Sequence, residues 1–225
     1  MTDTRSGRGV LATTLAAGAA VLVWKVAHPE VEPAFDNYGA GVATMVAVLA
    51  PLVGLLAMTS EWTQRTALTT FTLAPRRLPV LGAKYVASLV VAFGMVAVCL
   101  AMAAAATAIG GALHGPASFD GWAGDIRYAV IFVLLQVTMA VAFGALASNT
   151  PVALGAFLLA PTLWSALADN VLRSSAEWFD IFAAYGRLSS DDALADIAQT
   201  LTAVTVWVVL PAAVGLVRSV RREVK

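Results

Sequence analysis

Six long apolar stretches, separated by short polar segments, constrain this chain more than any other feature of its sequence. They cover residues 10–26, 39–58, 85–113, 128–147, 152–168 and 197–217. A helix needs about 20 mostly apolar residues to cross the hydrocarbon core of a bilayer, and a helix satisfies its own backbone hydrogen bonds there. We therefore expect an all-α polytopic membrane protein, with six transmembrane helices in a single domain over residues 1–225.

The composition supports this expectation. Hydrophobic residues make up 60% of the chain and charged residues 12%, whereas a soluble domain carries about a quarter charged residues. The formal net charge is zero, so no overall basic or acidic balance indicates a nucleic acid as partner. The single cysteine, Cys99, lies in an apolar stretch and excludes an intrachain disulfide and a cysteine cluster for a metal.

The distribution of basic residues predicts the orientation in the membrane. Lys and Arg gather in the short cytoplasmic loops of membrane proteins. With both termini in the cytoplasm, that side holds ten of the 14 basic residues, namely Arg5, Arg8, Arg65, Arg76, Arg77, Lys84, Arg218, Arg221, Arg222 and Lys225. The opposite assignment would place only Lys25, Arg127, Arg173 and Arg187 inside, so we expect cytoplasmic N- and C-termini.

Two features of the apolar stretches have more than one interpretation. Arg5 and Arg8 precede an alanine-rich stretch as in a signal peptide, but no convincing cleavage site follows, which favours an uncleaved anchor. Pro51, Pro161 and Pro211 lie inside predicted spans, where they permit kinks that serve either moving helices or ordinary packing.

The cytoplasmic loop of residues 61–84 is the largest segment predicted to face inward. A helix over residues 62–74 would place Ala67, Leu68 and Phe71 on one face and threonines on another, and Pro75 would end it. The loop is also basic, which suits either a protein partner or a topology signal bound to anionic lipid.

The outer segment of residues 169–196 is also patterned. Trp178, Ile181, Phe182 and Tyr185 recur at i, i+3, i+4 and i+7, which predicts an amphipathic or re-entrant helix between the fifth and sixth spans. Aromatic side chains also gather at membrane interfaces for physical reasons alone. The run of Ser189, Ser190, Asp191 and Asp192 is expected to cap the start of the last helix.

Enzyme chemistry has little support in the sequence. Every Asp, Glu, Lys and Arg falls at the end of a span or in a loop, and no H-E-x-x-H, G-x-S-x-G or P-loop motif occurs. Gln136 is the most polar residue near the middle of a span, either bonded to a neighbouring helix or in contact with a substrate. A membrane enzyme that uses His28 or His114 is the weakest candidate.

One family accounts for these features together. The segment Glu61-Trp62-Thr63-Gln64-Arg65-Thr66, followed by Pro75-Arg76-Arg77 and by Ala83-Lys84 directly before the third span, resembles the first cytoplasmic loop of type-2 ABC exporter permeases. That loop often has Gly-Thr where this chain has Arg65-Thr66. The resemblance covers the whole chain in architecture and about 25 residues in motif.

The resemblance implies a half-permease that pairs with a second copy or a homologous permease, each copy seated on a cytoplasmic ABC ATPase. Its ATPase-coupling helix would include Glu61, Trp62, Arg65, Leu68, Phe71, Pro75, Arg76 and Arg77. The outer gate would include Trp178, Ile181, Phe182 and Tyr185. ATP and Mg²⁺ would bind to the ATPase, so this chain would hold no cofactor and would be no enzyme by itself.

The expected function is therefore that of the permease subunit of an exporter in a bacterial plasma membrane. Its cargo would be amphipathic, lipid-like or drug-like, or a small peptide. The alternative is a membrane interaction protein, such as an immunity or assembly factor, without transport activity.

Overall fold

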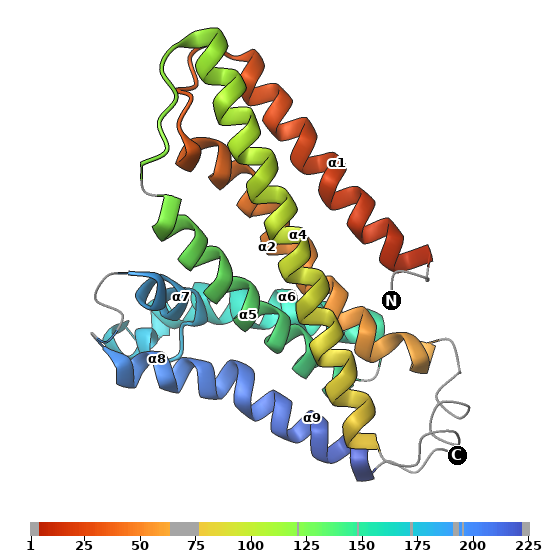
Figure 1. Ribbon diagram of the computed structural model, residues 1–225. Coiled ribbons are helices and arrows are strands. Elements are labelled where there is room, and N and C mark those ends of the chain that lie inside the picture. Colours follow the sequence, from red (N-terminus) through yellow and green to blue (C-terminus); the bar gives the residue numbers. More distant parts are fainter. Residues whose placement is uncertain are drawn as a thin grey trace.

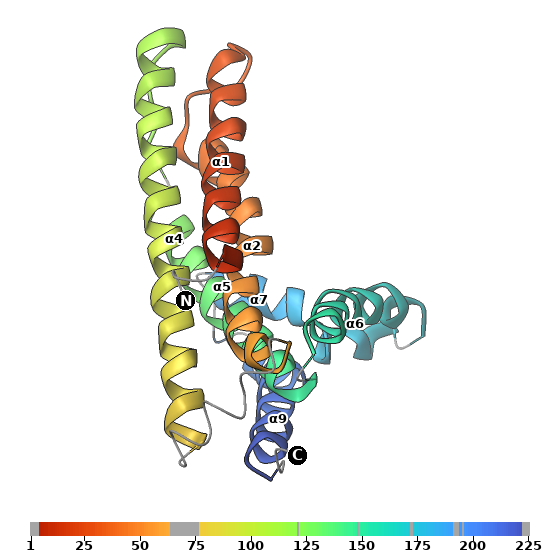
Figure 2. The ribbon, with the colours of Figure 1, turned by 90° about the vertical axis from the view of Figure 1, so that its right-hand side faces the viewer.

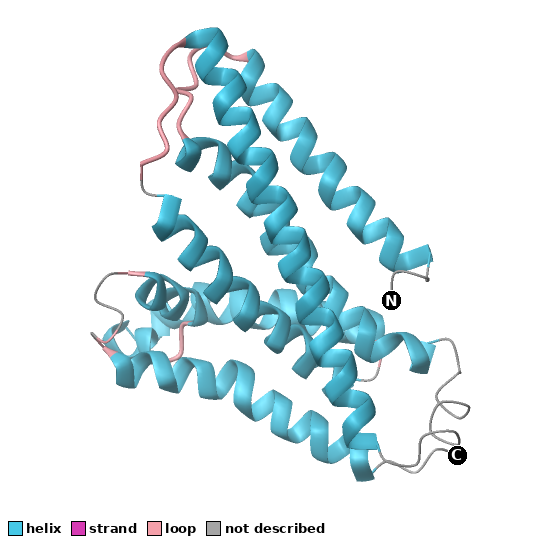
Figure 3. Ribbon diagram, viewed as in Figure 1, coloured by secondary structure: helices cyan, strands magenta, loops and turns pink. Residues whose placement is uncertain are grey.

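The computed structural model describes residues 5–63, 77–120, 122–147, 149–171, 173–190, 194 and 196–221, which are mostly helical (Figure 3). The long helices are α1 (Arg5–Ala27), α2 (Phe35–Thr63), α4 (Arg77–His114), α5 (Trp122–Ala147) and α6 (Thr150–Val171). They are followed by η1 (Arg173–Trp178), α7 (Ile181–Ser189), α8 (Ile197–Val204), η2 (Thr205–Val209) and α9 (Leu210–Arg221). Among the described residues no strand forms, and an isolated parallel bridge joins Ala34 to Ser118.

The prediction of six spans is confirmed at the level of helix length and composition. Six helical segments are long and apolar enough to cross a membrane: α1, α2, α4, α5, α6 and the continuous run of α8, η2 and α9. The third begins at Arg77, earlier than residue 85, because a helix can continue through polar residues beyond its apolar stretch. The chain is thus a multi-pass helical membrane protein.

The helices alternate in direction along the chain. In Figures 1 and 2, α1 and α4 rise side by side while α2 and α5 descend beside them. Figure 1 places the last turn of α2, the first turn of α4 and the last turn of α9 at the lower right. That the end marked by these turns faces the cytoplasm stays a prediction from the basic residues.

Two apolar cores meet at α2 and α5. The first lies between α1, α2, α4 and α5, and its buried members include Tyr38 and Val42. The second lies between α2, α5, α6, α7 and the last span, and its buried members include Leu55, Ile181 and Tyr185. Because α2 and α5 contribute to both cores, these two helices hold the two halves of the molecule together.

Close contact between α2 and α5 depends on glycines. A Cβ atom on Gly54 would lie 2.9 Å from Val141 Cγ2 and 3.2 Å from the Val137 carbonyl oxygen. A Cβ atom on Gly144 would lie 2.9 Å from Met58 Cβ. Helices in membranes associate through such small residues, because lipid offers no hydrophobic drive for their contact.

The last span is widened by a π-helical turn. The Leu210 amide donates to the carbonyl of Thr205, five residues earlier, and Pro211 follows at once. Proline has no N–H, and its ring crowds the carbonyl four residues before it, which here belongs to Trp207. The π turn accommodates this crowding, so Pro211 accounts for the local departure from α-helix.

Candidate functional site

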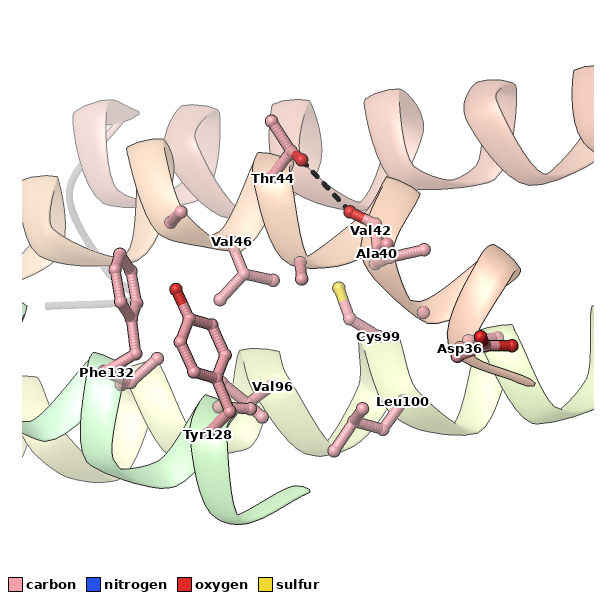
Figure 4. Close-up of a pocket in the computed structure, with 16 residues that line it drawn as sticks. Asp36, Ala40, Val42, Thr44, Val46, Val96, Cys99, Leu100, Tyr128 and Phe132 are labelled. Carbon is pink, nitrogen blue, oxygen red and sulfur yellow. Dashed lines mark hydrogen bonds between the residues drawn. The ribbon is translucent and has the colours of Figure 1, made fainter. Parts of the chain in front are cut away.

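A cavity of about 460 Å³ lies between α2, α4 and α5. It is lined by Asp36, Gly39, Ala40, Val42, Ala43, Thr44, Val46 and Ala47 of α2, by Val96, Cys99, Leu100 and Ala103 of α4, and by Tyr128, Ala129, Phe132 and Val133 of α5. Figure 4 shows Asp36 at one end and the rings of Tyr128 and Phe132 at the other.

Small side chains on α2 create this space. Gly39, Ala43 and Ala47 recur every four residues and therefore share one face of the helix, which lines the cavity. Further along α2, Gly54 brings the helix against α5. The cavity thus occupies the region between the contact at Gly54 and the first turns of α2 and α5.

The cavity was not predicted from the sequence. Its polar and aromatic residues, Asp36, Tyr128 and Phe132, were assigned no role, since each resembles an ordinary residue at the end of a span. The available signal was the spacing of Gly39, Ala43 and Ala47, but small residues at this spacing equally indicate close helix packing.

Aromatic side chains connect the cavity to α7. The ring of Phe132 lies 5.6 Å from that of Tyr128 and 5.1 Å from that of Tyr185, between ring centroids. The Tyr185 and Phe182 rings of α7 are 6.3 Å apart. A displacement of α7 would therefore reach the cavity wall through Tyr185 and Phe132.

The four residues predicted to form an outer gate do not share one face of one helix. Trp178 ends η1, and α7 begins at Ile181. Ile181 and Tyr185 are buried, with 1% and 2% of their surface exposed, whereas Trp178 and Phe182 are 40% and 43% exposed. The periodic pattern thus consists of a buried pair on α7 and two exposed aromatic residues.

Asp180 explains why a new helix, α7, begins after η1. Its Oδ1 accepts hydrogen bonds from the amides of Phe182 at 2.8 Å and Ala183 at 3.3 Å, which caps α7. Its Oδ2 accepts a bond of 3.2 Å from the Ser165 hydroxyl on α6. The same carboxylate therefore begins α7 and attaches it to α6.

The other end of α7 and the preceding loop are attached to the last span. The Arg187 guanidinium donates to Thr200 Oγ1 at 3.0 Å and to the Glu177 carbonyl at 3.2 Å. Trp207 Nε1 donates to the Phe179 carbonyl at 2.7 Å.

The phenol of Tyr185 lies in an apolar environment. Burial is the larger cause, and electrostatic repulsion from Tyr128 the smaller one, that raises the pKa of this phenol above its usual value.

The prediction that Ser189 and Ser190 cap the last helix is wrong, and Asp191 and Asp192 of the same predicted cap lie outside the described residues. Ser189 is the last residue of α7, and Ser190 is its C-cap. The last span begins at Ile197, after Asp196, whose φ of 54° lies in the left-handed region and whose side chain makes no capping bond. Asp tolerates this backbone conformation better than most residues do.

Most of the predicted coupling segment falls outside the described residues. Arg65, Leu68, Phe71, Pro75 and Arg76 lie there. Glu61 and Trp62 belong to the last turn of α2, and Arg77 is the first residue of α4. The structure therefore shows that long helices flank the segment on both sides.

The remaining polar candidates do not form a reaction site in the described part of the chain. His28 Nδ1 lies 2.7 Å from the Trp24 carbonyl oxygen, and His114 Nε2 lies 2.8 Å from that of Val26. Gln136 is buried, and its Oε1 accepts no hydrogen bond from the described residues. No group of three or more His, Cys, Asp or Glu side chains among them is arranged to hold a metal ion.

Comparison of the chain with family models, with curated proteins and with solved structures found no significant match. The arguments for function therefore rest on the residues and their arrangement.

Proposed function

We infer that this chain is the membrane-spanning permease subunit of an ATP-binding cassette exporter in a bacterial plasma membrane. It moves an amphipathic, lipid-like or drug-like molecule, or a small peptide, with energy from ATP hydrolysed on a separate cytoplasmic ATPase that binds Mg²⁺. The observation that carries this inference is the segment from Glu61 to Arg77, which resembles the loop by which such permeases contact their ATPase.

The helices that flank this segment support the inference. The 38 residues of α4 give a length of about 57 Å at about 1.5 Å per residue, whereas the hydrocarbon core is about 30 Å thick. The excess is consistent with extension of α4 into water at its first turns, where Arg77 and Lys84 precede the apolar stretch. The loop before Arg77 would then be held away from the lipid, within reach of a soluble partner.

The source of energy also favours a separate ATPase. The sequence has no P-loop, so this chain does not bind nucleotide phosphates through that motif. No Asp, Glu, Lys or Arg lies near the middle of a predicted span, where proton- and ion-coupled carriers place such residues. Energy for transport would therefore enter through a contact with another protein.

The outer segment supports a pathway that is closed on the outer side. Tyr185 of α7 packs against Phe132, which lines the cavity, and α7 is tied to α6 through Asp180. In this proposal Ile181 and Tyr185 form the fixed part of the outer closure, while Trp178 and Phe182 face lipid or a second permease copy.

Purification of the tagged chain in mild detergent tests the proposal. A cytoplasmic ATPase with P-loop and signature motifs should co-purify, and its hydrolysis should be stimulated. Reversal of charge in Glu61→Lys or Arg65→Glu should weaken that association, because complementary charges set the docking of partners. Leu68→Asp or Phe71→Asp should weaken it further, since an unpaired carboxylate buried in a contact costs several kcal/mol.

Thr70→Ala, on the opposite face of the predicted helix, is the matched control and should leave the association unchanged. Membrane levels of every variant must equal those of the parent chain. If the four variants insert normally and hold a fully coupled ATPase, the segment is a topology signal only. If no ATPase accompanies the parent chain, the alternative of an interaction, immunity or assembly protein replaces the exporter.

A further inference from the structure

We propose that the cavity between α2, α4 and α5 binds an elongated amphipathic molecule with a single positive charge. The charged group lies at Asp36, and the apolar body extends toward Tyr128 and Phe132. Binding by this chain alone does not depend on export. The identification of that molecule as the exported cargo rests on the proposed function.

The size of the cavity suits a small organic ligand. Binding pockets for such ligands occupy about 300–1,000 Å³ and are mostly apolar, with a few polar groups that fix orientation. This cavity has a volume of about 460 Å³, within that range. It lies between three helices that also form the first core, so its walls are set by packing and exist before a ligand arrives.

The middle of the cavity is apolar. Val46, Val96 and Cys99 lie between its two ends in Figure 4, and all three are buried. Apolar surface removed from water contributes about 25 cal/mol per Å². The central part thus favours the hydrocarbon portion of a ligand and disfavours a wholly polar solute such as a sugar or an inorganic ion.

The charge at one end selects the sign of the ligand. Asp36 is the one acidic or basic residue among those that line the cavity, and no described residue forms an ion pair with its carboxylate. Lys25, the basic residue nearest to Asp36 in sequence, does not line the cavity, and its ammonium donates to the Asn37 carbonyl. A cation at this end would therefore be attracted and an anion repelled.

The opposite end offers aromatic faces to the apolar body. The rings of Tyr128 and Phe132 are stacked at 25° between their planes, and Tyr128 remains 39% exposed. Flat or aromatic groups pack well on such rings, with offset stacking or edge contacts. Asp36 and the two rings thus define a polar end and an aromatic end, the pattern of an amphipathic cation.

Calorimetric titration of the purified chain in lipid nanodiscs, with empty nanodiscs as blank, tests the proposal without an ATPase. The probes are phenylbutyltrimethylammonium and phenylbutanesulfonate, which share an apolar body and differ in the sign of the head group. The cation should bind saturably at one site per chain. The anion should neither bind there nor displace the cation.

Two pairs of variants locate the site. Asp36→Asn should weaken binding of the cation by about tenfold, which corresponds to about 1.4 kcal/mol, while Glu32→Gln in the segment just before α2 should change it by less than about twofold. Ala47→Leu fills the cavity and should weaken binding by at least about tenfold. Ala213→Leu, an identical change on an exposed position of α9, should have no effect.

Three results would overturn the proposal. Equal binding of cation and anion would mean that the cavity accepts any apolar chain, including a lipid tail. Equal effects of Asp36→Asn and Glu32→Gln would mean a general surface charge. Saturable binding that survives Ala47→Leu would place the ligand elsewhere. Because Asp36→Asn is isosteric and Asp36 is exposed, loss of folding does not confound it, and none of these results bears on ATPase association.

Discussion

At the scale of single residues, Asp180 joins two helices through its side chain. It accepts hydrogen bonds from two amides of α7 and from the Ser165 hydroxyl of α6. One carboxylate therefore sets where α7 begins and bonds this helix to α6. The chain before it is held by Trp207 through the Phe179 carbonyl. The position of Tyr185 against Phe132 therefore depends on Asp180.

Asp180→Ala should destabilise the protein by about 1–3 kcal/mol, the sum of a lost helix cap and a lost hydroxyl contact. Asp180→Asn keeps an oxygen acceptor and should cost less than the alanine variant. Thermal unfolding in one detergent, followed by tryptophan fluorescence, measures both, and Ser165→Ala isolates the bond to α6. Equal losses for Asn and Ala would show that the negative charge, and not the capping oxygen, is what α7 requires.

The same residue shows where sequence reasoning failed at this scale. The spacing of Trp178, Ile181, Phe182 and Tyr185 was interpreted as one helix, because periodicity records side-chain directions and ignores capping chemistry. An Asp directly before an apolar run is itself a start signal, and here that signal at Asp180 determined the helix. Ile181 and Tyr185 kept the predicted i, i+4 relation because both follow the cap.

At the scale of helices, the contact between α2 and α5 yields a matched pair of glycine variants. Gly54→Ala should destabilise the protein by about 1–3 kcal/mol, since its new methyl group would meet Val141 and the Val137 carbonyl. Gly94→Ala on α4 meets no atom within 4 Å and should stabilise by up to about 1 kcal/mol, because alanine favours helix over glycine. Thermal unfolding of both variants under identical conditions measures whether the two changes in stability have opposite signs. A stabilising Gly54→Ala would contradict the close packing.

Helix number was predictable and helix ends were less so. Hydropathy marks the part of a helix that suits lipid, so the third apolar stretch began at residue 85 while α4 begins at Arg77. Pro211 was expected to permit a kink, and the structure shows a π turn directly before it. The form of that distortion depends on how the backbone carbonyls near Thr205 rearrange. The presence of a proline alone does not predict this rearrangement.

At the scale of the whole molecule, the cavity could not be predicted because it depends on which helices are neighbours. The small residues on α2 indicated close packing in general, and along α2 they serve both packing at Gly54 and space near Ala43. The periodicity of small residues does not distinguish close packing from a cavity, since the outcome depends on which residues of the neighbouring helix face them. The central position of α2 and α5, which contribute to both cores, could equally not be predicted from their apolar stretches.

Topology is the prediction that tests the whole arrangement. Ten basic residues are predicted to lie in the cytoplasm and four outside. Arg77 begins α4 and Arg218 belongs to the last turn of α9. Figure 1 shows these two helix ends at the same end of the molecule. Fusions of a fluorescent protein that folds only in the cytoplasm should be bright after Pro75 and at Lys225. Fusions of a phosphatase active only outside should be active near Asp120 and Asp191.

The two reporters are complementary, so each site gives one positive and one negative signal, and a failed fusion is recognised by the absence of both. Phosphatase activity after Pro75 would reverse the orientation. It would place the segment from Glu61 to Arg77 outside the cell, where no ATPase could reach it, and would place the end of the cavity marked by Asp36 toward the cytoplasm. The exporter proposal would then fail, whereas binding of an amphipathic cation would remain open to direct measurement.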